Sequence, residues 1–210
     1  MFREVLRKVC AEELRHEIVG EAGDGRTAVG LALTTSPDLV LLDLHLPNLD
    51  GFGVVEALRK IAPEIRILVL SSHCDEYTVW RAERARVLGF VDKNTNTVAT
   101  LKDAIAAVSA GRTYFSDTFK RVKAARIKDA QSFDKVLTNR ELDVLALIGV
   151  PLNDDEIAHQ LKLSAGTVAK HRFNALRKLE LRSLSELVRY ARDHGLTLSP
   201  PPNGAGAILP

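Results

Sequence analysis

The stretch LVLLDLHLPNLDG (residues 39–51) indicates the fold class, because an apolar run ends at once in a single carboxylate, Asp43. A run of Leu and Val without polar alternation is typical of a strand that helices cover on both faces of a parallel sheet. Two further runs of this character follow, IRILVL (65–70) and GFV (89–91). The three runs predict a parallel α/β sheet.

Helical patterns separate these runs, and the alternation of strand and helix favours the same fold class. The sequence predicts helices over the first ten residues and over 27–35, 52–61, 76–88 and 98–110. It also predicts a strand over 17–22, EIVGEA. Pro37 and Pro63 mark two of the helix ends, since a residue before proline disfavours the helical conformation.

Polar residues stand at the ends of three predicted strands: Asp43, Ser71 and Lys93. Open parallel sheets bind ligands at the carboxyl ends of their strands, so these side chains are expected to converge on a small anionic group. A carboxylate there can accept a phosphoryl group, while a hydroxyl and an ammonium stabilise the transferred oxygens. Mg²⁺ would offset the combined negative charge. Taken singly, each residue could equally be an ordinary polar group at a strand end.

Residues 1–116 resemble bacterial receiver domains of the NarL/FixJ type, on the segments LVLLDLHLPNLDG, ILVLSSH and GFVDK. The resemblance implies a flavodoxin-like fold, with Asp43 as phosphoacceptor, Ser71 as switch hydroxyl and Lys93 as the partner lysine. It implies Phe90 as the switch aromatic residue and a Mg²⁺ site that includes Asp43 and the backbone carbonyl of His45. It further implies a sensor histidine kinase as phosphoryl donor.

The chain departs from that family at its start. Receiver domains begin with a strand that ends in two acidic residues, whereas this sequence begins at a predicted helix. This departure favours a missing or misassigned N-terminal segment. The alternative is a degenerate receiver, used for dimerisation or sensing without phosphorylation. An α/β phosphohydrolase is disfavoured, because position 45 is His where such an enzyme needs a second carboxylate, and because residues 137–196 are left unexplained. No turnover enzyme is expected.

From Leu137 onward the apolar spacing is helical throughout. Helices are predicted over 137–149, 153–161 and 165–179, with Asn153 and Ser164 as N-caps, and a last helix ends at Gly195. Two short helices joined by a tight turn, the second of them basic, fit a helix-turn-helix. Residues 137–196 resemble LuxR-type DNA-binding domains on LTNRELDVL, EIAHQLKLSAGTV and ALRKL.

The third of these helices is the predicted DNA-reading helix. The segment 164–182 carries five Lys or Arg residues and one Glu, as phosphate contacts require. Lys170 is expected to reach base edges and Asn174 to reach either bases or backbone. The DNA backbone contacts are expected from Thr167, His171, Arg177 and Lys178. Ala169 and Phe173 stand where lysine or another polar residue is usual; they could touch thymine methyls or weaken recognition.

The apolar face of the last helix (Leu184, Leu187, Val188 and Ala191) allows two interpretations: packing inside the domain, or a homodimer surface that matches two-fold DNA sites. Four segments are expected: a receiver (1–116), a polar, weakly helical linker (117–136), the helix-turn-helix domain (137–196) and a disordered tail (197–210). The net charge of +2 excludes a uniformly basic surface, and no apolar run is long enough to cross a bilayer. We expect a cytoplasmic protein, without a disulfide framework between its two cysteines.

Overall fold

The structure is a computed structural model that describes residues 2–95, 97–148 and 152–196. The chain divides into two compact units, and the main division falls within helix α6, between Arg121 and Val122. Within the described residues no helix is both long enough and apolar enough to span a bilayer. The predicted tail, 197–210, lies outside the described residues.

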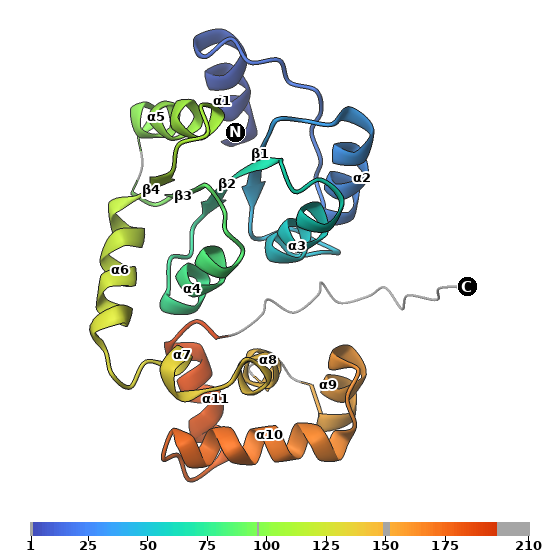
Figure 1. Cartoon of the computed structure of the whole chain (residues 1–210), viewed down its shortest axis with the longest axis vertical. Coiled ribbons are helices and arrows are strands. Elements are labelled where there is room, and N and C mark those ends of the chain that lie inside the picture. Colours follow the sequence, from blue (N-terminus) through green and yellow to red (C-terminus); the bar gives the residue numbers. More distant parts are fainter. Residues whose placement is uncertain (1, 96, 149–151, 197–210) are drawn as a thin grey trace. The chain divides into compact units, whose positions relative to one another are not determined.

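The first unit is built on a parallel sheet in the order β1-β2-β3-β4 (Figure 1). Its strands are β1 (Leu39–Asp43), β2 (Arg66–Ser71), β3 (Gly89–Asp92) and β4 (Tyr114–Phe115). Its helices are α1 (Phe2–Lys8), continued by a π-helical turn η1 (Val9–Glu13), α2 (Gly25–Thr35), α3 (Gly51–Ile61), α4 (Glu76–Arg84) and α5 (Val98–Ser109). The α/β fold class is therefore confirmed.

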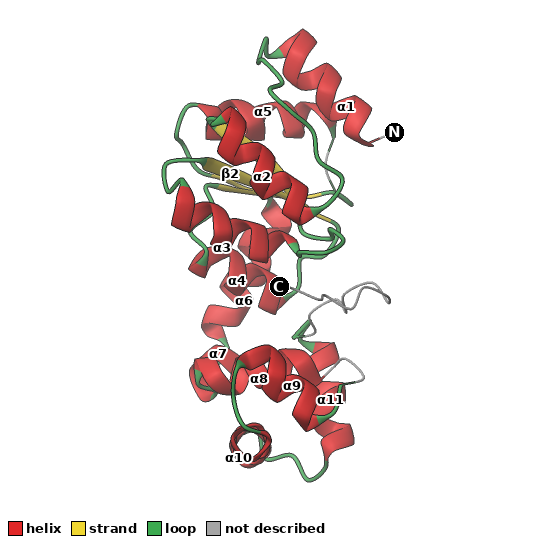
Figure 2. Ribbon diagram, turned by 90° about the vertical axis from the view of Figure 1, so that its right-hand side faces the viewer, coloured by secondary structure: helices red, strands yellow, loops and turns green. Residues whose placement is uncertain are grey.

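Helices cover both faces of this sheet, as the apolar strands predict (Figures 1 and 2). On one face, η1 and α5 pack against β2 and β3 in a core that includes Val9, Leu68, Val91 and Ile105. Helices α3 and α4 lie on the opposite face (Figure 2). Strand β2 is buried along almost its whole length, so it forms the centre of the unit.

The strand predicted over residues 17–22 is wrong. Those residues form no strand, and among the described residues β2 is the only strand that pairs with β1. A strand persists only where a neighbour takes up its backbone hydrogen bonds. The segment packs by close contact instead: a Cβ added at Gly20 would lie 2.4 Å from the Leu31 side chain of α2.

The expectation of weak helical character over 117–136 is also corrected. These residues form two helices, α6 (Asp117–Lys128) and the short α7 (Phe133–Val136). Tertiary packing accounts for the difference, because Phe119 and Phe133 are fully buried. Helix α4 ends at Arg84, four residues before its predicted end, and β4 was not predicted, since two residues carry no periodic signal.

The remaining helices are α8 (Asn139–Ile148), α9 (Asp154–Leu161), α10 (Ala165–Lys178) and α11 (Leu184–Asp193). Their shared core includes Leu142, Leu145, Ile157, Val168 and Leu187, each nearly inaccessible to solvent. The predicted caps are confirmed. Asn153 and Glu156 form a reciprocal capping box on α9, and Ser164 caps α10.

Candidate functional sites

The predicted acceptor residue Asp43 lies at the carboxyl end of β1 and touches Lys93. The Lys93 Nζ donates to Asp43 Oδ2 at 2.5 Å, and the backbone N–H of His45 donates to Asp43 Oδ1 at 2.9 Å. The two side chains are 50 residues apart in the sequence. The parallel register brings them together, because Asp43 pairs with Leu70 and Ser71 pairs with Asp92, directly before Lys93.

Ser71 completes the strand edge from the neighbouring strand. It is inaccessible to solvent, and its hydroxyl accepts a hydrogen bond from the backbone N–H of His73 at 3.1 Å. Asp43, Ser71 and Lys93 therefore occupy one edge of the sheet, where the Lys93 ammonium forms an ion pair with the Asp43 carboxylate. Arg81, which the sequence analysis missed, binds Asp50 on the loop after β1 at 3.3 Å.

The loop after Asp43 folds back so that the start of α3 lies beside the acceptor residue. The backbone N–H of Gly51 donates to the carbonyl of Leu44 at 3.0 Å. A Cβ at position 51 would lie 2.5 Å from the carbonyl oxygen of Asp43 and 2.6 Å from Cα of Leu44. Glycine is required here by this close approach of two backbones. Gly51, at the start of α3, thus holds the loop after β1 close to Asp43.

Phe90 is buried in β3 and belongs to an aromatic cluster with Phe115 and Phe119. The ring centroids of Phe90 and Phe119 are 5.1 Å apart, and those of Phe115 and Phe119 are 4.6 Å apart. Phe119 is a residue of α6. The predicted switch aromatic residue therefore contacts the helix in which the two units divide. Sequence reasoning missed Phe119, because its surroundings are polar and basic.

The oxygen donors expected for Mg²⁺ are of the right chemical kind but few. Asp43 supplies a carboxylate and His45 a backbone carbonyl, and Mg²⁺ usually completes its shell with water. Among the described residues no cluster of three or more His, Cys, Asp or Glu side chains is arranged to hold a metal ion. The rings of His45 and His73 lie at this edge with their centroids 4.4 Å apart, and both residues are exposed.

In the second unit, the turn between α9 and α10 has the form of a helix-turn-helix. Helix α9 ends at Leu161. The next residue, Lys162, adopts a left-handed conformation with φ of 55°, and Ser164 then caps α10. Arg172 of α10 binds Asp154 at the start of α9. This ion pair ties the start of α9 to α10.

A second ion pair fixes α10 against α8. Lys178 Nζ lies 2.8 Å from the Oε2 of Glu141, whose side chain is only 4% exposed. Burial of Glu141 opposes its ionisation, but hydrogen bonds from Lys178 and Thr138 outweigh burial and hold the pKa of its carboxyl below the usual value. Lys178, predicted to contact DNA, therefore has a structural partner. Sequence reasoning missed Glu141, because its partner is 37 residues away.

The other predicted DNA-contacting residues fall into two groups. Lys170 and Arg177 are exposed, on the side of α10 opposite the buried Val168 and Ala175. The remaining three are partly buried: Thr167, His171 and Asn174. The hydroxyl of Thr167 lies 2.8 Å from that of Ser164, and Nδ1 of His171 is buried without a hydrogen-bond partner in the structure.

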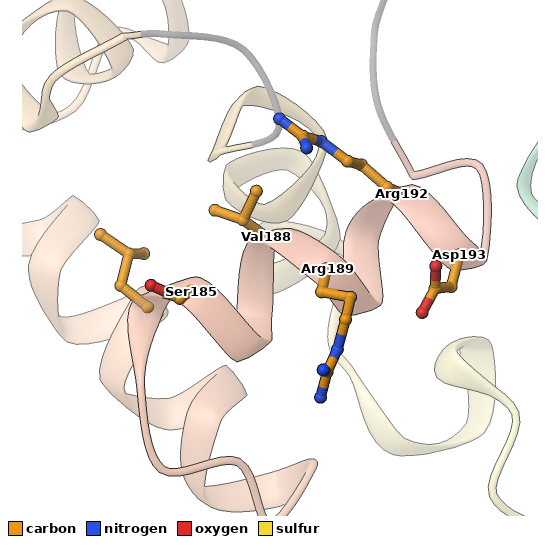
Figure 3. Close-up of a pocket in the computed structure, with 6 residues that line it drawn as sticks. Ser185, Val188, Arg189, Arg192 and Asp193 are labelled. Atoms are coloured by element: carbon orange, nitrogen blue, oxygen red, sulfur yellow. The ribbon is translucent and has the colours of Figure 1, made fainter.

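Helix α11 divides its apolar residues between core and surface. Leu187 and Ala191 are buried, whereas Leu184 is 47% exposed. Leu184 and Val188 line a shallow hollow of about 650 Å³ together with Ser185, Arg189, Arg192 and Asp193 (Figure 3). One half of this face therefore packs inside the domain, as the first interpretation predicts, and the other half faces outward.

Comparison with known proteins gives the family. Residues 1–106 match the family described as "Response regulator receiver domain", and residues 135–191 match "Bacterial regulatory proteins, luxR family". The chain belongs to the response regulator family. The regulator is 35% identical over 181 residues to Fimbriae Z protein of Salmonella typhimurium (strain LT2), covering 86% of each chain. It is 32% identical to the response regulator protein VraR of Staphylococcus aureus over 180 residues, again 86% of each.

Solved structures share the fold of this regulator. RcsB of Salmonella enterica serovar Typhimurium, bound to promoter rprA in the presence of the phosphomimetic BeF3−, matches with a TM-score of 0.60 and 21% identity. The match covers 90% of this chain and 92% of RcsB. A LuxR family response regulator from Aurantimonas sp. SI85-9A1 matches at 30% identity and a TM-score of 0.56, covering 60% of this chain and 90% of that one. The regulator thus combines a receiver with a LuxR-type helix-turn-helix, as the sequence motifs indicate.

Proposed function

We propose that this response regulator is switched by transfer of a phosphoryl group to Asp43. The observation that carries the proposal is the 2.5 Å contact between Asp43 and Lys93 at the carboxyl edge of the sheet. A carboxylate that is 36% exposed can be reached by a phosphodonor, and Lys93 is ready to neutralise the incoming oxygens. Ser71, one strand further along, supplies a hydroxyl at the same edge.

The chemical step is an in-line displacement at phosphorus. An oxygen of Asp43 attacks the phosphorus of a phosphohistidine on a sensor kinase, a P–O bond forms and the P–N bond breaks. The leaving imidazole nitrogen keeps the electron pair and takes up a proton. Lys93 then moves from the carboxylate to the phosphoryl oxygens, and the Ser71 hydroxyl turns to donate to one of them. Mg²⁺, held by Asp43 and the carbonyl of His45, would supply charge neutralisation.

The aromatic cluster offers a route from this edge to the rest of the chain. When Ser71 turns toward the phosphoryl group, Phe90 on the adjacent strand repacks, and its contact with Phe119 carries the change into α6. Packed cores respond by moving between discrete arrangements rather than by smooth deformation. The proposed output is a shift in the population of two receiver conformations.

The output of the second unit is DNA binding by α10. Lys170 and Arg177 would contact DNA from its exposed side, and Asn174, Thr167 and His171 from its flank. Two copies would pair through the outward half of α11, where Leu184 and Val188 lie beside Arg189 and Arg192. A solved structure of RcsB is described as two dimers bound to two parallel DNAs, which supports a homodimer here. As a DNA-binding response regulator of the bacterial type, the protein would act in the cytoplasm and turn over no substrate.

A phosphodonor experiment tests this proposal. The chain is incubated with acetyl phosphate and Mg²⁺ and followed by intact mass, gel filtration and DNA affinity. We expect a mass gain of one phosphoryl group, an increase in dimer and tighter DNA binding, all absent in Asp43→Asn. An unlabelled wild-type chain, or a label that persists in Asp43→Asn, would contradict the proposal.

A phosphorylation-independent regulator is the second candidate. The observation in its favour is the short set of metal donors at the acceptor edge, where the Asp43 Oδ2 is held by Lys93. In that case the receiver serves dimerisation, and the ion pair is structural. This candidate predicts DNA binding of equal strength with and without phosphodonor, in the wild type and in Asp43→Asn. It also predicts that phosphodonor labels neither the wild type nor Lys93→Ala, and that Lys93→Ala lowers the free energy of unfolding.

A further inference from the structure

Phe173 is exposed to solvent and does not pack in the core of the domain. Its side chain is 65% exposed, more than that of any other large apolar residue in the described part of the chain. It lies on α10, whose packing residues are Val168 and Ala175 on the opposite side. Such exposure leaves apolar surface in water that a ligand on this side of the helix would cover.

The neighbours of Phe173 identify what it binds. Lys170 stands three residues before it and Arg177 four residues after it, so the three side chains share the exposed side of the helix. Ala169, four residues before Phe173, adds a small apolar group next to them. The combination of flanking cations and a central apolar strip matches the major groove of DNA, where phosphates border the base edges. The C5-methyl of thymine is the apolar feature of those edges.

We propose that Phe173 reads thymine by packing on its C5-methyl group, so that each half of the DNA site requires a thymine at one fixed position. This proposal rests on DNA binding by α10. Phenylalanine has no hydrogen-bonding group, so it distinguishes thymine from cytosine through the methyl alone. Recognition is then divided: Arg177 supplies attraction to the phosphates, Lys170 reaches base edges, and Phe173 supplies the preference for thymine.

Deoxyuridine provides the test, because it differs from thymidine only in lacking the methyl group. A site is first selected from a random duplex library with the full chain. Each thymine of that site is then replaced singly by deoxyuridine, and affinities are measured for the wild type and for Phe173→Ala. We expect the wild type to lose about fourfold in affinity at one position per half-site, the effect of one buried methyl-sized group. Phe173→Ala should show no loss at that position.

Two control variants make the result specific. Arg177→Ala should weaken binding to every duplex but keep the deoxyuridine effect, and Phe173→Leu should keep it because leucine remains apolar. Far-ultraviolet circular dichroism verifies that each variant is folded. A wild type indifferent to every deoxyuridine, or a Phe173→Ala variant that responds as the wild type does, would overturn the thymine proposal while DNA binding stands. If no sequence is selected at all, DNA binding by α10 itself fails. The exposed Phe173 would then contact another protein instead of DNA.

Discussion

Glu141 couples the stability of the second unit to pH. Its ionised carboxylate, buried against α10, accepts hydrogen bonds from Lys178 and from the backbone of Thr138. Because the folded pKa lies below the usual value of 4.5, the ionised form adds stability above pH 4.5. That stability is lost as the pH falls from about 4.5 through the lower folded pKa.

The pH dependence can be measured with Glu141→Gln, which keeps the shape and removes the charge. At pH 7 we expect the free energy of unfolding to fall by about 1–3 kcal/mol, the range for a buried group that loses a charged hydrogen-bond partner. Between pH 6 and pH 3 the variant should lose stability less steeply than the wild type in urea titrations. Parallel pH curves for the two proteins would show that the ion pair does not contribute.

Phe90 offers a second prediction at the level of a single residue. Its side chain is inaccessible to solvent, so Phe90→Ala leaves a cavity among Phe115 and Phe119. A loss of about 3–5 kcal/mol in the free energy of unfolding is expected. Phe173→Ala is the matched control, since an exposed position should change stability by less than about 0.5 kcal/mol. Equal losses in the two variants would mean that the burial of Phe90 is not what stabilises the receiver.

Among the helices, α9 depends on its capping box. The Asn153 side chain accepts a hydrogen bond from the backbone N–H of Glu156 at 2.9 Å. In return, the Glu156 carboxylate accepts one from the backbone N–H of Asn153 at 2.7 Å. Asn153→Ala should cost about 1 kcal/mol of stability. Gln160→Ala, at an exposed position of the last turn, serves as the control and should leave urea midpoints within error. A larger loss from the control would show that the helix end, not the cap, limits stability.

The two faces of α10 should respond differently to salt. Arg177→Ala should lower the slope of log affinity against log salt by about 1, since one phosphate contact is removed. Lys178→Ala should leave that slope nearly unchanged and lower the free energy of unfolding instead, because Lys178 is paired with Glu141. Fluorescence anisotropy over a range of KCl concentrations distinguishes the cases. A drop in slope for Lys178→Ala would assign it to the phosphate backbone after all.

The secondary structure that follows from periodicity could be read from the sequence, and the rest depended on neighbours. Strands β1, β2 and β3 were predicted because an uninterrupted apolar run can be recognised without knowing its partner. The strand predicted over 17–22 failed because pairing is a property of two segments. Helix α6 was underestimated because distant contacts stabilise it, such as the burial of Phe119 and the ion pair of Arg126 with Asp134. The site shows the same limit. Strand ends predicted the meeting of Asp43 with Lys93, whereas nothing near Lys178 in the sequence points to Glu141.

For the whole molecule, Phe119 tests how the two units are coupled. Phe119→Leu keeps an apolar side chain but loses the ring that packs on Phe90. Acetyl phosphate should still add one phosphoryl group, as measured by intact mass. The ratio of DNA affinities with and without phosphodonor should fall toward one, because the route through α6 is weakened. A variant with normal labelling and an unchanged ratio would place the coupling elsewhere.

The exposed side of α10 also bears on how such a regulator diverges. Lys170, Phe173 and Arg177 are all exposed, so substitutions there should alter DNA affinity or the preferred DNA sequence at little cost to folding. Val168, Ala175 and the Glu141–Lys178 pair carry the packing on the other side. After gene duplication, a few codons could therefore redirect one copy to new promoters while both copies keep the same architecture. Selection must preserve the buried side of α10, whereas the exposed side is free to vary.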